Sequence, residues 1–414
     1  MSRLVEAVVP ARLGSGFRWL LASSWVSNLS DGLAIAAGPL LVASLTRDPF
    51  LIALAATVQW LPPLVFGLWA GVVSDRLDRR TVVIAVDLAR AGVLAVLTLA
   101  IATGEVSIAV VLAALFCLGT AEVFADNASH ALLPTLLHRD DLAIGNARVM
   151  FGFGTLNQLA GPPLGAALFV VGAAWPFAAQ VLLVVLGAVL VSRIVLPRQE
   201  RDRAVHQHIR RDIAEGFRWA YEHAAVRTLV LTIFTFNITF GAAWSVLVLY
   251  ATQRLGMGAV GFGLLTTVSA VGGIIGTLAY GRITRHVSLG DIMRIGLVIE
   301  TFTHLALAVT TVPWVAMVIF FVFGAHAFIW GTTSAAVRQR AVPSSLQGRV
   351  GAVNTVGVYG GLVIGSAIGG LLAQQWGVTA PFWFAFAGSA IFVVLIWGQL
   401  THIAHTDEET PAEV

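Results

Sequence analysis

Long apolar segments separated by short polar ones run along nearly the whole sequence. A helix needs about 20 mostly apolar residues to cross the hydrocarbon core of a bilayer. Twelve segments reach that length, six in each half of the chain: 17–45, 50–73, 81–102, 106–129, 148–172 and 175–196, then 227–251, 259–281, 291–310, 313–336, 350–374 and 379–403. The pattern therefore predicts an all-α membrane protein with 12 transmembrane helices.

The composition has too few polar residues to cover a soluble protein of this size. Of the 414 residues, 57% are hydrophobic and 11% are charged, and the mean hydropathy is +0.85, which is typical of a chain in a bilayer. All 25 basic residues are arginines spread over many loops, so we expect no nucleic-acid partner. The single cysteine, Cys117, excludes an intrachain disulfide.

The arginines predict which side of the membrane each loop faces. With both termini in the cytoplasm, the outer loops contain only Arg47 and Arg254. The inner segments contain Arg76, Arg79 and Arg80, then Arg139 and Arg148, those from Arg193 to Arg227, Arg282, Arg285 and Arg294, and Arg338, Arg340 and Arg349. Because positive residues concentrate in cytoplasmic loops, we expect a multi-pass protein of the inner (plasma) membrane with both termini cytoplasmic.

A polar insertion in the middle of the chain divides the spans six and six. Within it, Ile213, Phe217 and Ala220 recur at helical spacing, which predicts an amphipathic helix on the inner membrane surface. We therefore expect a six-helix bundle at 1–196, a cytoplasmic linker at 197–225, a second six-helix bundle at 226–403 and a disordered acidic tail at 404–414.

The two halves of the chain repeat one another. At an offset of 209 residues the matched pairs are Asn28 and Asn237, Gly32 and Gly241, Gly67 and Gly276, Arg76 and Arg285, Pro134 and Pro343, and Gly161 and Gly370. Duplicated parallel halves imply a pseudo-twofold axis along the membrane normal, with a cavity between the two bundles. Such a duplication suits alternating access.

The loop between the second and third spans carries a motif made of Gly71, Asp75, Arg76, Asp78, Arg79 and Arg80. Its spacing resembles the signature of the major facilitator superfamily, with Asp78 where that family usually has glycine. The resemblance implies the major facilitator fold, with two pseudo-symmetric six-helix bundles. It also implies that this loop latches the inner side of a transporter.

The fifth span contains Gly161-Pro162-Pro163-Leu164-Gly165-Ala166, which resembles a G-P-x-x-G-G element of exporters in that superfamily. Prolines kink a helix, and small residues let a neighbouring helix approach closely, so we expect a hinge at Gly161, Pro162, Pro163 and Gly165. Further segments resemble the enterobactin-exporter-like and macrolide-efflux-like branch, which implies export. They are Asp31-Gly32, Ala131-Leu132-Leu133-Pro134 with Leu142 and Asn146, and Gln339 with Ala341-Val342-Pro343 and Gly348-Arg349-Val350.

Ionisable residues within the spans are candidates for proton coupling, because a charge at the bilayer centre costs at least ~2.5 kcal/mol unless it faces a cavity or a partner. At ~1.5 Å per residue, Asp31, Glu300 and His326 fall near mid-depth. Asp31, a lone carboxylate, is expected to exchange protons or to bind a cationic substrate, with helix packing as the alternative. Glu300 and His304 lie one turn apart and form either a protonatable pair or a structural contact.

A second group of charges lies nearer the cytoplasm. Asp87 and Arg90 lie in the third span, and Glu122 and Asp126 in the fourth. We expect ion pairs at this depth to form a cytoplasmic gate that breaks on inward opening, and Glu122 is also a candidate for proton transfer with Asp31. The predicted gate consists of Gly71, Asp75, Arg76, Asp78, Arg79, Arg80, Asp87, Arg90 and Asp126.

Polar and aromatic residues within the spans are candidates for binding a substrate. They are Asn28, Asn157, Asn237, Trp244 and Trp330, although tryptophans also form belts at the membrane interface. Without lysine the chain has no phosphate-binding G-x-x-x-x-G-K-[ST] loop. The histidines at 205, 208, 402 and 405 lack companion ligands at metal spacing. We expect no enzyme, no metal and no cofactor, with transport driven by the proton gradient.

Together these patterns predict a secondary active transporter. It is expected to be a monomer that exports a hydrophobic or amphipathic small molecule, such as a drug or siderophore, in exchange for protons. Its expected partners are that substrate and the lipid bilayer. Because buried acids do not set the direction of transport, an importer or a lipid flippase of the same fold is an alternative, as is a non-transporting membrane sensor or scaffold.

Overall fold

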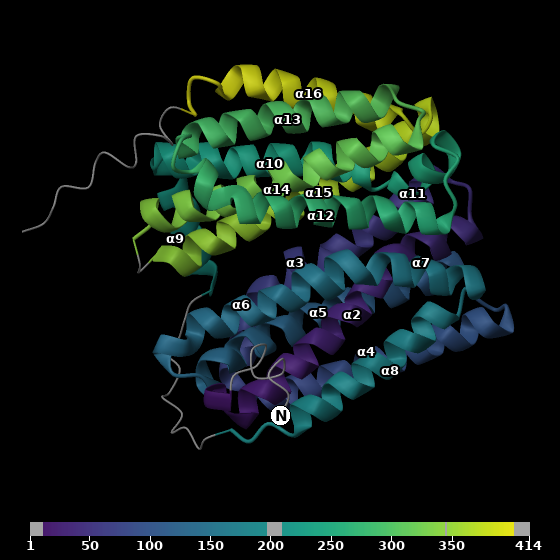
Figure 1. The fold of residues 1–414 in the computed structure, drawn as a ribbon, viewed down its shortest axis with the longest axis vertical. Coiled ribbons are helices and arrows are strands. Elements are labelled where there is room, and N and C mark those ends of the chain that lie inside the picture. The colour runs from purple at the N-terminus through teal and green to yellow at the C-terminus, as the bar shows by residue number, and fades with distance from the viewer. Residues whose placement is uncertain (1–10, 197–208, 344–345, 401–414) are drawn as a thin grey trace, which may run out of the picture. The chain divides into compact units, whose positions relative to one another are not determined.

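The computed structural model describes residues 11–196, 209–343 and 346–400, which are almost entirely helical (Figure 1). The helices are η1 (Ala11–Leu13), α2 (Gly14–Leu45), α3 (Pro49–Arg76), α4 (Arg79–Thr103), α5 (Ile108–Leu136), η2 (Arg139–Asp141), α6 (Leu142–Gly152), η3 (Phe153–Ala160), α7 (Gly161–Val171), α8 (Trp175–Ser192), α9 (Ile209–Glu222), α10 (Ala224–Trp244), α11 (Leu247–Leu249), η4 (Tyr250–Arg254), α12 (Ala259–Ile283), α13 (Leu289–Val309), α14 (Pro313–Ala341), α15 (Gln347–Trp376) and α16 (Ala380–Ile396). The predicted tail and the histidines at 205, 208, 402 and 405 lie outside the described residues.

All twelve predicted spans fall on helical segments, and the seventh, 227–251, extends over α10, α11 and the start of η4. Within the described ranges, ten helices are long and apolar enough to cross a membrane, and the shorter α16 is also apolar. The fifth span is a continuous run of α6, η3 and α7, in which η3 is a π-helix. The prediction of an all-helical membrane fold is therefore confirmed.

Contacts group the described residues into two compact units. The first contains those within Met1–Leu45, Val65–His206 and Phe262–Thr267, and the second those within Thr46–Leu64, Gln207–Gly261 and Val268–Val414. The grouping follows contacts rather than chain order, so a part of α3 belongs to the second unit and a part of α12 to the first. The division into bundles at 1–196 and 226–403 stays a prediction.

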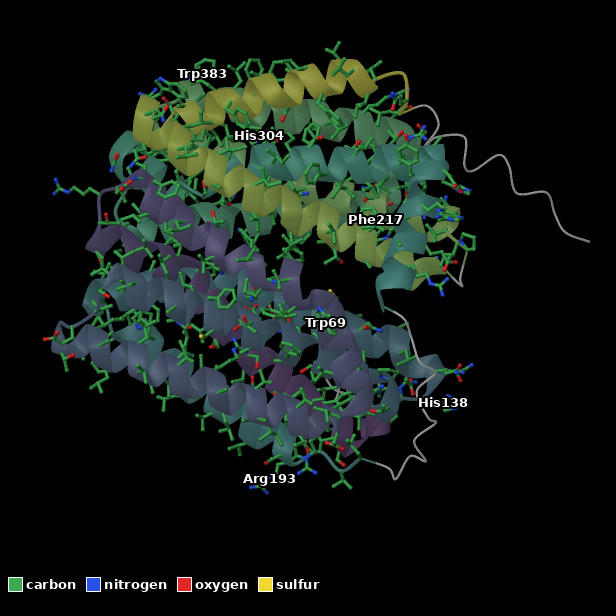
Figure 2. The ribbon with its side chains drawn as sticks, turned by 180° about the vertical axis from the view of Figure 1, so that it is seen from behind. Trp69, His138, Arg193, Phe217, His304 and Trp383 are labelled. Atoms are coloured by element: carbon green, nitrogen blue, oxygen red, sulfur yellow. The ribbon has the colours of Figure 1, made fainter. Side chains whose placement is uncertain are left out.

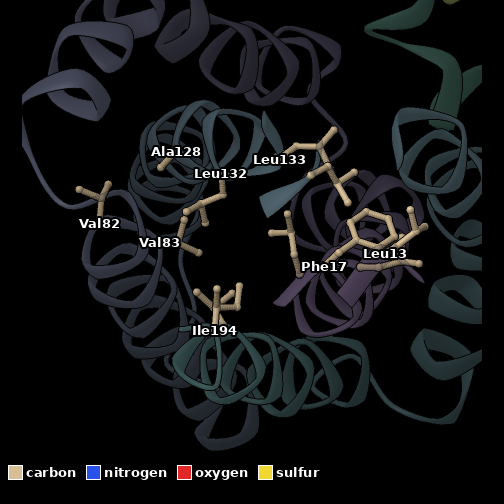
Figure 3. Packing of buried hydrophobic residues seen from close by; sticks show 12 residues of the cluster. Leu13, Phe17, Val82, Val83, Ala128, Leu132, Leu133 and Ile194 are labelled. Atoms are coloured by element: carbon tan, nitrogen blue, oxygen red, sulfur yellow. The ribbon is translucent and has the colours of Figure 1, made fainter. Parts of the chain in front are cut away.

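A cluster of apolar side chains forms a core at one end of the first unit (Figure 3). It combines residues of α2, α4 and α5 with residues at the end of α8, and Phe17, Leu132 and Ile194 are fully buried in it. Lipid tails are as apolar as these side chains, so the close fit of the side chains, rather than water exclusion, holds the helices together.

Glycines allow α2 to approach η3 and α7 at backbone distance. A Cβ atom on Gly32 would lie 2.7 Å from the carbonyl oxygen of Asn157, and one on Gly165 would collide with the backbone of Leu33. A Cβ atom on Gly161 would collide with the Cα atom of Gly32. Small residues at such contacts are typical of helices packed in membranes. The predicted hinge therefore lies in a tight helix contact, while its movement stays a prediction.

The prolines of the predicted hinge form the first turn of α7, directly after η3. Proline has no N–H to donate to the carbonyl group four residues earlier, and for Pro163 that acceptor is Leu159. The hydroxyl oxygen of Thr267 lies 3.2 Å from the Leu159 oxygen and 3.1 Å from that of Gly263 on its own helix. A neighbouring hydroxyl of this kind can satisfy a carbonyl group freed by proline.

A matching close contact joins α10 and α15 in the second unit. Three glycines of α15 face three α10 residues so closely that no Cβ atom fits: Gly361 against Phe234, Gly365 against Ile238, and Gly369 against Ala242. The four-residue spacing of Gly161 and Gly165 on α7 recurs in these three glycines of α15. Both units thus pack a first helix against a glycine-bearing fifth helix, as the internal repeat implies.

The packing also corrects the register of the repeat at one position. The sequence pairs Gly161 with Gly370, but Gly370 lies against Phe50 of α3. The residue that packs as Gly161 does is Gly365: four residues further along, Gly165 meets Leu33 and Gly369 meets Ala242, which is the repeat position of Leu33. A fixed offset misses this shift, since the loops between the spans differ in length between the halves.

The amphipathic helix predicted in the linker is present as α9, and it packs on α10 and α15. The sequence places Phe217 and Ala220 on one apolar face. In the structure Ala220 is buried and Phe217 is 44% exposed (Figure 2), because α9 meets α15 through Gly216. A membrane surface can cover an exposed Phe217, so the orientation of the apolar face toward the inner membrane surface stays a prediction; the side chain of Ile213 lies outside those described.

Candidate functional site

A stripe of polar residues runs along α2 within an otherwise apolar span. Ser23, Ser24, Ser27, Asn28 and Asp31 follow one another at spacings that place them on one side of the helix. All five line a cavity of about 260 Å³ inside the first unit. The Asn28 amide donates to the carbonyl oxygen of Ser24 at 2.8 Å, which fixes its orientation within the stripe.

Arg90 of α4 reaches into the same cavity and is only 6% exposed. Its guanidinium group donates a hydrogen bond to the carboxylate of Asp31. Its Nη1 atom also lies 3.6 Å from Oδ1 of Asp87, one turn earlier on α4, and Asp87 is 2% exposed. The sequence predicts a lone carboxylate at Asp31; this is wrong, because Arg90 pairs with it across two helices.

Two further acids line the cavity from α5. They are Glu122 and Asp126, and His130 follows one turn after Asp126. From η3, Asn157 also lines the cavity, and its side-chain oxygen Oδ1 accepts a 2.6 Å hydrogen bond from the side-chain amide of Gln158. With the two aspartates that flank Arg90, four carboxyl groups share the wall with one guanidinium group.

The residues of the predicted gate occupy two different places. Asp87, Arg90 and Asp126 line the cavity, whereas the loop residues hold helix ends together. Asp78 is the N-cap of α4 and accepts from the N–H of Thr81 at 2.8 Å.

The loop arginines bond to backbone groups of neighbouring helices. Arg79 donates to the carbonyl oxygen of Ala131 at 2.8 Å, and Arg80 donates to that of Ser192. The Gly71 position has open space around it. The side chains of Asp75 and Arg76 lie outside those described. Gating by this loop therefore stays a prediction.

The pair predicted between Glu300 and His304 is not formed. Glu300 turns instead toward α14, where its Oε2 atom lies 3.6 Å from Nε2 of His326. His304 faces Trp244 edge-on, with ring centroids 6.1 Å apart, and Figure 2 shows it among the helices of the second unit. Gly296 allows this arrangement, because a side chain there would crowd the ring of His326.

The five predicted substrate residues divide between the units. Asn28 and Asn157 line the cavity of the first unit. In the second unit, Asn237 donates to the carbonyl oxygen of Ile233 at 2.7 Å, Trp244 joins an aromatic cluster, and Trp330 lies beside Gly296. Substrate binding by these residues stays a prediction.

Sequence reasoning missed Ser23, Ser24 and Ser27, as well as His130 of α5, which all line the cavity. A signal for the serines was present, because they extend the spacing of Asn28 and Asp31 toward the start of α2 by about one more helical turn. His130 gave no such signal, since it lies beyond the predicted end of the fourth span.

Comparison with known proteins identifies the family of this chain. Residues 7–413 match the family model described as transmembrane secretion effector. The chain belongs to this family of major facilitator transporters. Transmembrane secretion effectors are transporters and not enzymes, so the predictions of a membrane transporter and of a protein without enzyme activity are confirmed.

Several named relatives of this transmembrane secretion effector are efflux proteins. It is 25% identical over 402 residues to the enterobactin exporter EntS of Salmonella typhimurium, covering 94% of each chain. It is 27% identical over 385 residues to the multidrug efflux pump Tap of Mycolicibacterium fortuitum, covering 88% of this chain and 90% of the relative. Macrolide efflux protein A of Streptococcus pyogenes is 23% identical over 363 residues, covering 85% and 87%. The predicted branch is confirmed.

Solved structures support the fold of this transmembrane secretion effector. A bacterial homologue of the iron transporter ferroportin, in an inward-facing state, has a TM-score of 0.77 at 14% identity, covering 97% of this chain and all of that one. The nucleoside transporter NupG has a TM-score of 0.73 at 11% identity, covering 93% and 100%. At such identities the likeness concerns the fold alone, and it confirms the predicted major facilitator fold.

Proposed function

We propose that this transporter exports a hydrophobic or amphipathic small molecule, such as a drug or siderophore, from the cytoplasm in exchange for protons. The relatives named for enterobactin export, multidrug efflux and macrolide efflux support the outward direction. The acidic cavity of the first unit supports the exchange with protons, and it is the observation on which the proposal depends.

The charges of the cavity supply the physical reason for an exchange. Four carboxyl groups against one guanidinium group would leave three uncompensated negative charges if every acid were ionised. Each such charge inside a membrane costs at least ~2.5 kcal/mol. Protons neutralise this excess when no substrate is bound, and a positive group on a bound substrate displaces them. Protons and substrate then occupy the cavity in turn.

Arg90 links protonation to the packing of two helices. When Asp31 of α2 binds a proton, it no longer holds the guanidinium group as an ion pair. Arg90 then turns to Asp87, which is already 3.6 Å away on the same helix. The α2–α4 contact is weakened by this change of partner, which gives the protonation state a structural consequence.

The same proposal includes the arrangement of the protein in the membrane. The transporter lies in the plasma membrane. Both of its termini are in the cytoplasm, because the outer loops carry only Arg47 and Arg254. Bundles at 1–196 and 226–403 rock about a central passage, with the motif from Gly71 to Arg80 as the inner latch. A single chain is the transporting unit.

The test begins with a substrate panel in cells that lack their own efflux pumps. The panel pairs cationic and uncharged amphipathic compounds of similar size, and the measurement is their accumulation with and without the transporter. The best substrate is then followed in inside-out vesicles under an imposed proton gradient. We expect Asp31→Asn to lose gradient-driven uptake, whereas Glu105→Gln, on the exposed α4–α5 loop, keeps it.

Two results would contradict the proposal. Full gradient-driven transport by Asp31→Asn would mean that Asp31 does not couple transport to the proton gradient. Accumulation that rises in cells expressing the transporter would instead identify an importer.

A further inference from the structure

Glu300, His304 and His326 form a buried polar cluster in the second unit, apart from the acidic cavity of the first. Glu300 and His304 lie one turn apart on α13, and His326 lies on the adjacent α14. His304 is fully buried and His326 is 6% exposed. The side chain of Glu300 is 14% exposed. Three ionisable groups therefore lie together in the interior of a membrane-spanning unit.

The histidine rings of this cluster are unpartnered. Both nitrogen atoms of His304 and both of His326 lack a hydrogen-bond partner among the residues that the structure describes. The nearest acceptor is Oε2 of Glu300, 3.6 Å from Nε2 of His326, which is slightly beyond hydrogen-bond distance. Buried polar groups are nearly always hydrogen-bonded, so four unpaired nitrogens in one place indicate a site that changes its bonding when it takes up a ligand.

The walls around the cluster are aromatic. Trp244 of α10 faces His304, and Phe323 faces His326 with ring centroids 5.6 Å apart. Within the described residues, no group of three histidine, cysteine, aspartate or glutamate side chains is placed to hold a metal ion. The chemistry of the cluster therefore favours the smallest cation, a proton.

No arginine competes with the histidines as the partner of Glu300 in the described part of these helices. Arg294, on the same helix, is held by Asp291 at 3.2 Å and lies against the ring of Trp397. The helix α16 carries no ionisable residue. On α10, α12 and α14 the ionisable residues other than His326 lie at or near helix ends: Arg227, Tyr280, Arg282, Arg338 and Arg340. On α15, Arg349 lies in the first turn, and Tyr359 lies in the middle of the helix with its ring near that of Trp60.

We propose that Glu300, His326 and His304 form a second proton-binding site of this transporter. One proton on this cluster gives either a neutral carboxyl group beside a neutral His326 or a carboxylate beside a positively charged His326. The net charge is zero in both, so neither form leaves an isolated charge among apolar helices. A small rotation across the 3.6 Å separation makes the hydrogen bond. His304, one turn along α13, offers the next acceptor.

This inference rests on the proton exchange proposed above for its role in transport, to which it adds a second proton. Its test needs no substrate and no transport. Full-length protein in lipid nanodiscs is followed by infrared difference spectroscopy between mildly acidic and mildly alkaline pH. We expect a carboxyl C=O band that changes with pH, is lost in Glu300→Gln and is shifted in His326→Gln. If Glu300 has only a structural role, its carboxyl group keeps the same protonation state at both pH values and gives no such band.

Two variants serve as controls. Glu105→Gln leaves the band unchanged, because that side chain lies on an exposed loop. Asp31→Asn leaves the Glu300 band unchanged as well, because Asp31 belongs to the other unit. Each variant is first checked for a single, stable folded species. If Glu300→Gln does not fold, wild-type protein labelled with ¹⁵N-histidine replaces it, with His304→Gln and His326→Gln identifying the two signals.

The outcomes separate this inference from the proposed function. Spectra of folded Glu300→Gln that match the wild type, or ¹⁵N signals of both histidines that do not change with pH, would overturn the second site. A band lost in Glu300→Gln without any gradient-driven transport would support the site and count against the proposed exchange. Gradient-driven transport by a protein that shows no Glu300 band would support the proposed exchange and count against the second site.

Discussion

Arg90 of α4 donates a hydrogen bond to Asp31 of α2, and their side chains are only 7% and 19% exposed. The two residues lie on different spans, so the bond joins helices that are distant in the sequence. Arg90 has a second carboxylate, Asp87, at 3.6 Å, whereas among the described residues Arg90 is the only arginine that lines the cavity with Asp31. The two ends of this ion pair are therefore not equivalent.

That asymmetry predicts different costs for removing each end. Arg90→Gln leaves two buried carboxylates without their cation and should lower the free energy of unfolding by about 3–5 kcal/mol. Asp31→Asn should cost less, because Arg90 keeps Asp87. The double variant should cost less than the sum of the two single variants. Thermal unfolding of the purified proteins, analysed as a double-mutant cycle, measures all three; equal costs for the two single variants would contradict the role of Asp87.

The contact of α7 with α2 predicts a strong effect of a single methyl group. Gly165→Ala places its Cβ atom against the backbone of Leu33, so the helices must separate, at a cost of about 1–3 kcal/mol. Gly92→Ala is the matched control, since no atom lies within 4 Å of that position, and it should raise stability by about 0.5–1 kcal/mol. Melting temperatures of the two variants, measured in one detergent, check the prediction. An equal change in stability for both variants would contradict the role of the contact with Leu33.

The sequence was sufficient to predict the helices because bilayer thickness sets the length of each apolar segment. It also predicted that Asp31, Asp87, Arg90, Glu122 and Asp126 matter, because charges within apolar segments stand out. Which of them meet depends on how the helices are rotated about their axes. That rotation is set by backbone contacts between helices, and a one-dimensional pattern does not contain it.

The contacts that the sequence did not predict have a common physical origin. Glu300 and His304 share a helix face, yet Glu300 meets His326, because Gly296 makes room for a ring from α14. The contact of α9 with α15 runs through Gly216, and the neighbouring Phe217 is left 44% exposed. In both cases a glycine, which carries no hydrophobic signal, decides which neighbours make contact.

Tyr250 of η4, whose side chain reaches the last turn of α13, provides a further prediction about stability. The hydroxyl group of Tyr250 donates to the carbonyl oxygen of Leu307 at 2.7 Å, and both residues are fully buried. Leu307 is in the last turn of its helix, where carbonyl groups have no partner within the helix. Tyr250→Phe leaves this acceptor unpaired and should cost about 1–3 kcal/mol.

Tyr221→Phe is the control for Tyr250→Phe, because its ring is 73% exposed and its loss of a hydroxyl group should change stability by no more than about 0.5 kcal/mol. Hydrogen exchange adds a local readout. Amides in the last turn of α13 should exchange faster in Tyr250→Phe alone. Unchanged exchange there would mean that the carbonyl group of Leu307 finds another donor.

The docking of α9 predicts which of two neighbouring contacts holds the linker helix. Glu215 and Arg349 form an ion pair at 2.8 Å, but their side chains are 50% and 35% exposed, and such pairs contribute about 0–1 kcal/mol. Beside them, a Cβ atom on Gly216 would lie 2.6 Å from the carbonyl oxygen of Arg349. Backbone contact, rather than charge, should therefore hold α9 on α15.

We expect Gly216→Leu to release α9 and Glu215→Gln to leave it docked. Limited trypsin digestion of full-length protein in nanodiscs, with cleavage sites identified by mass spectrometry, reports the release as faster cutting after Arg218. Ala214→Leu is the matched control, because Ala214 is exposed on the same helix and its added side chain meets no backbone. Faster cutting in Glu215→Gln than in Gly216→Leu would assign the docking to the ion pair instead.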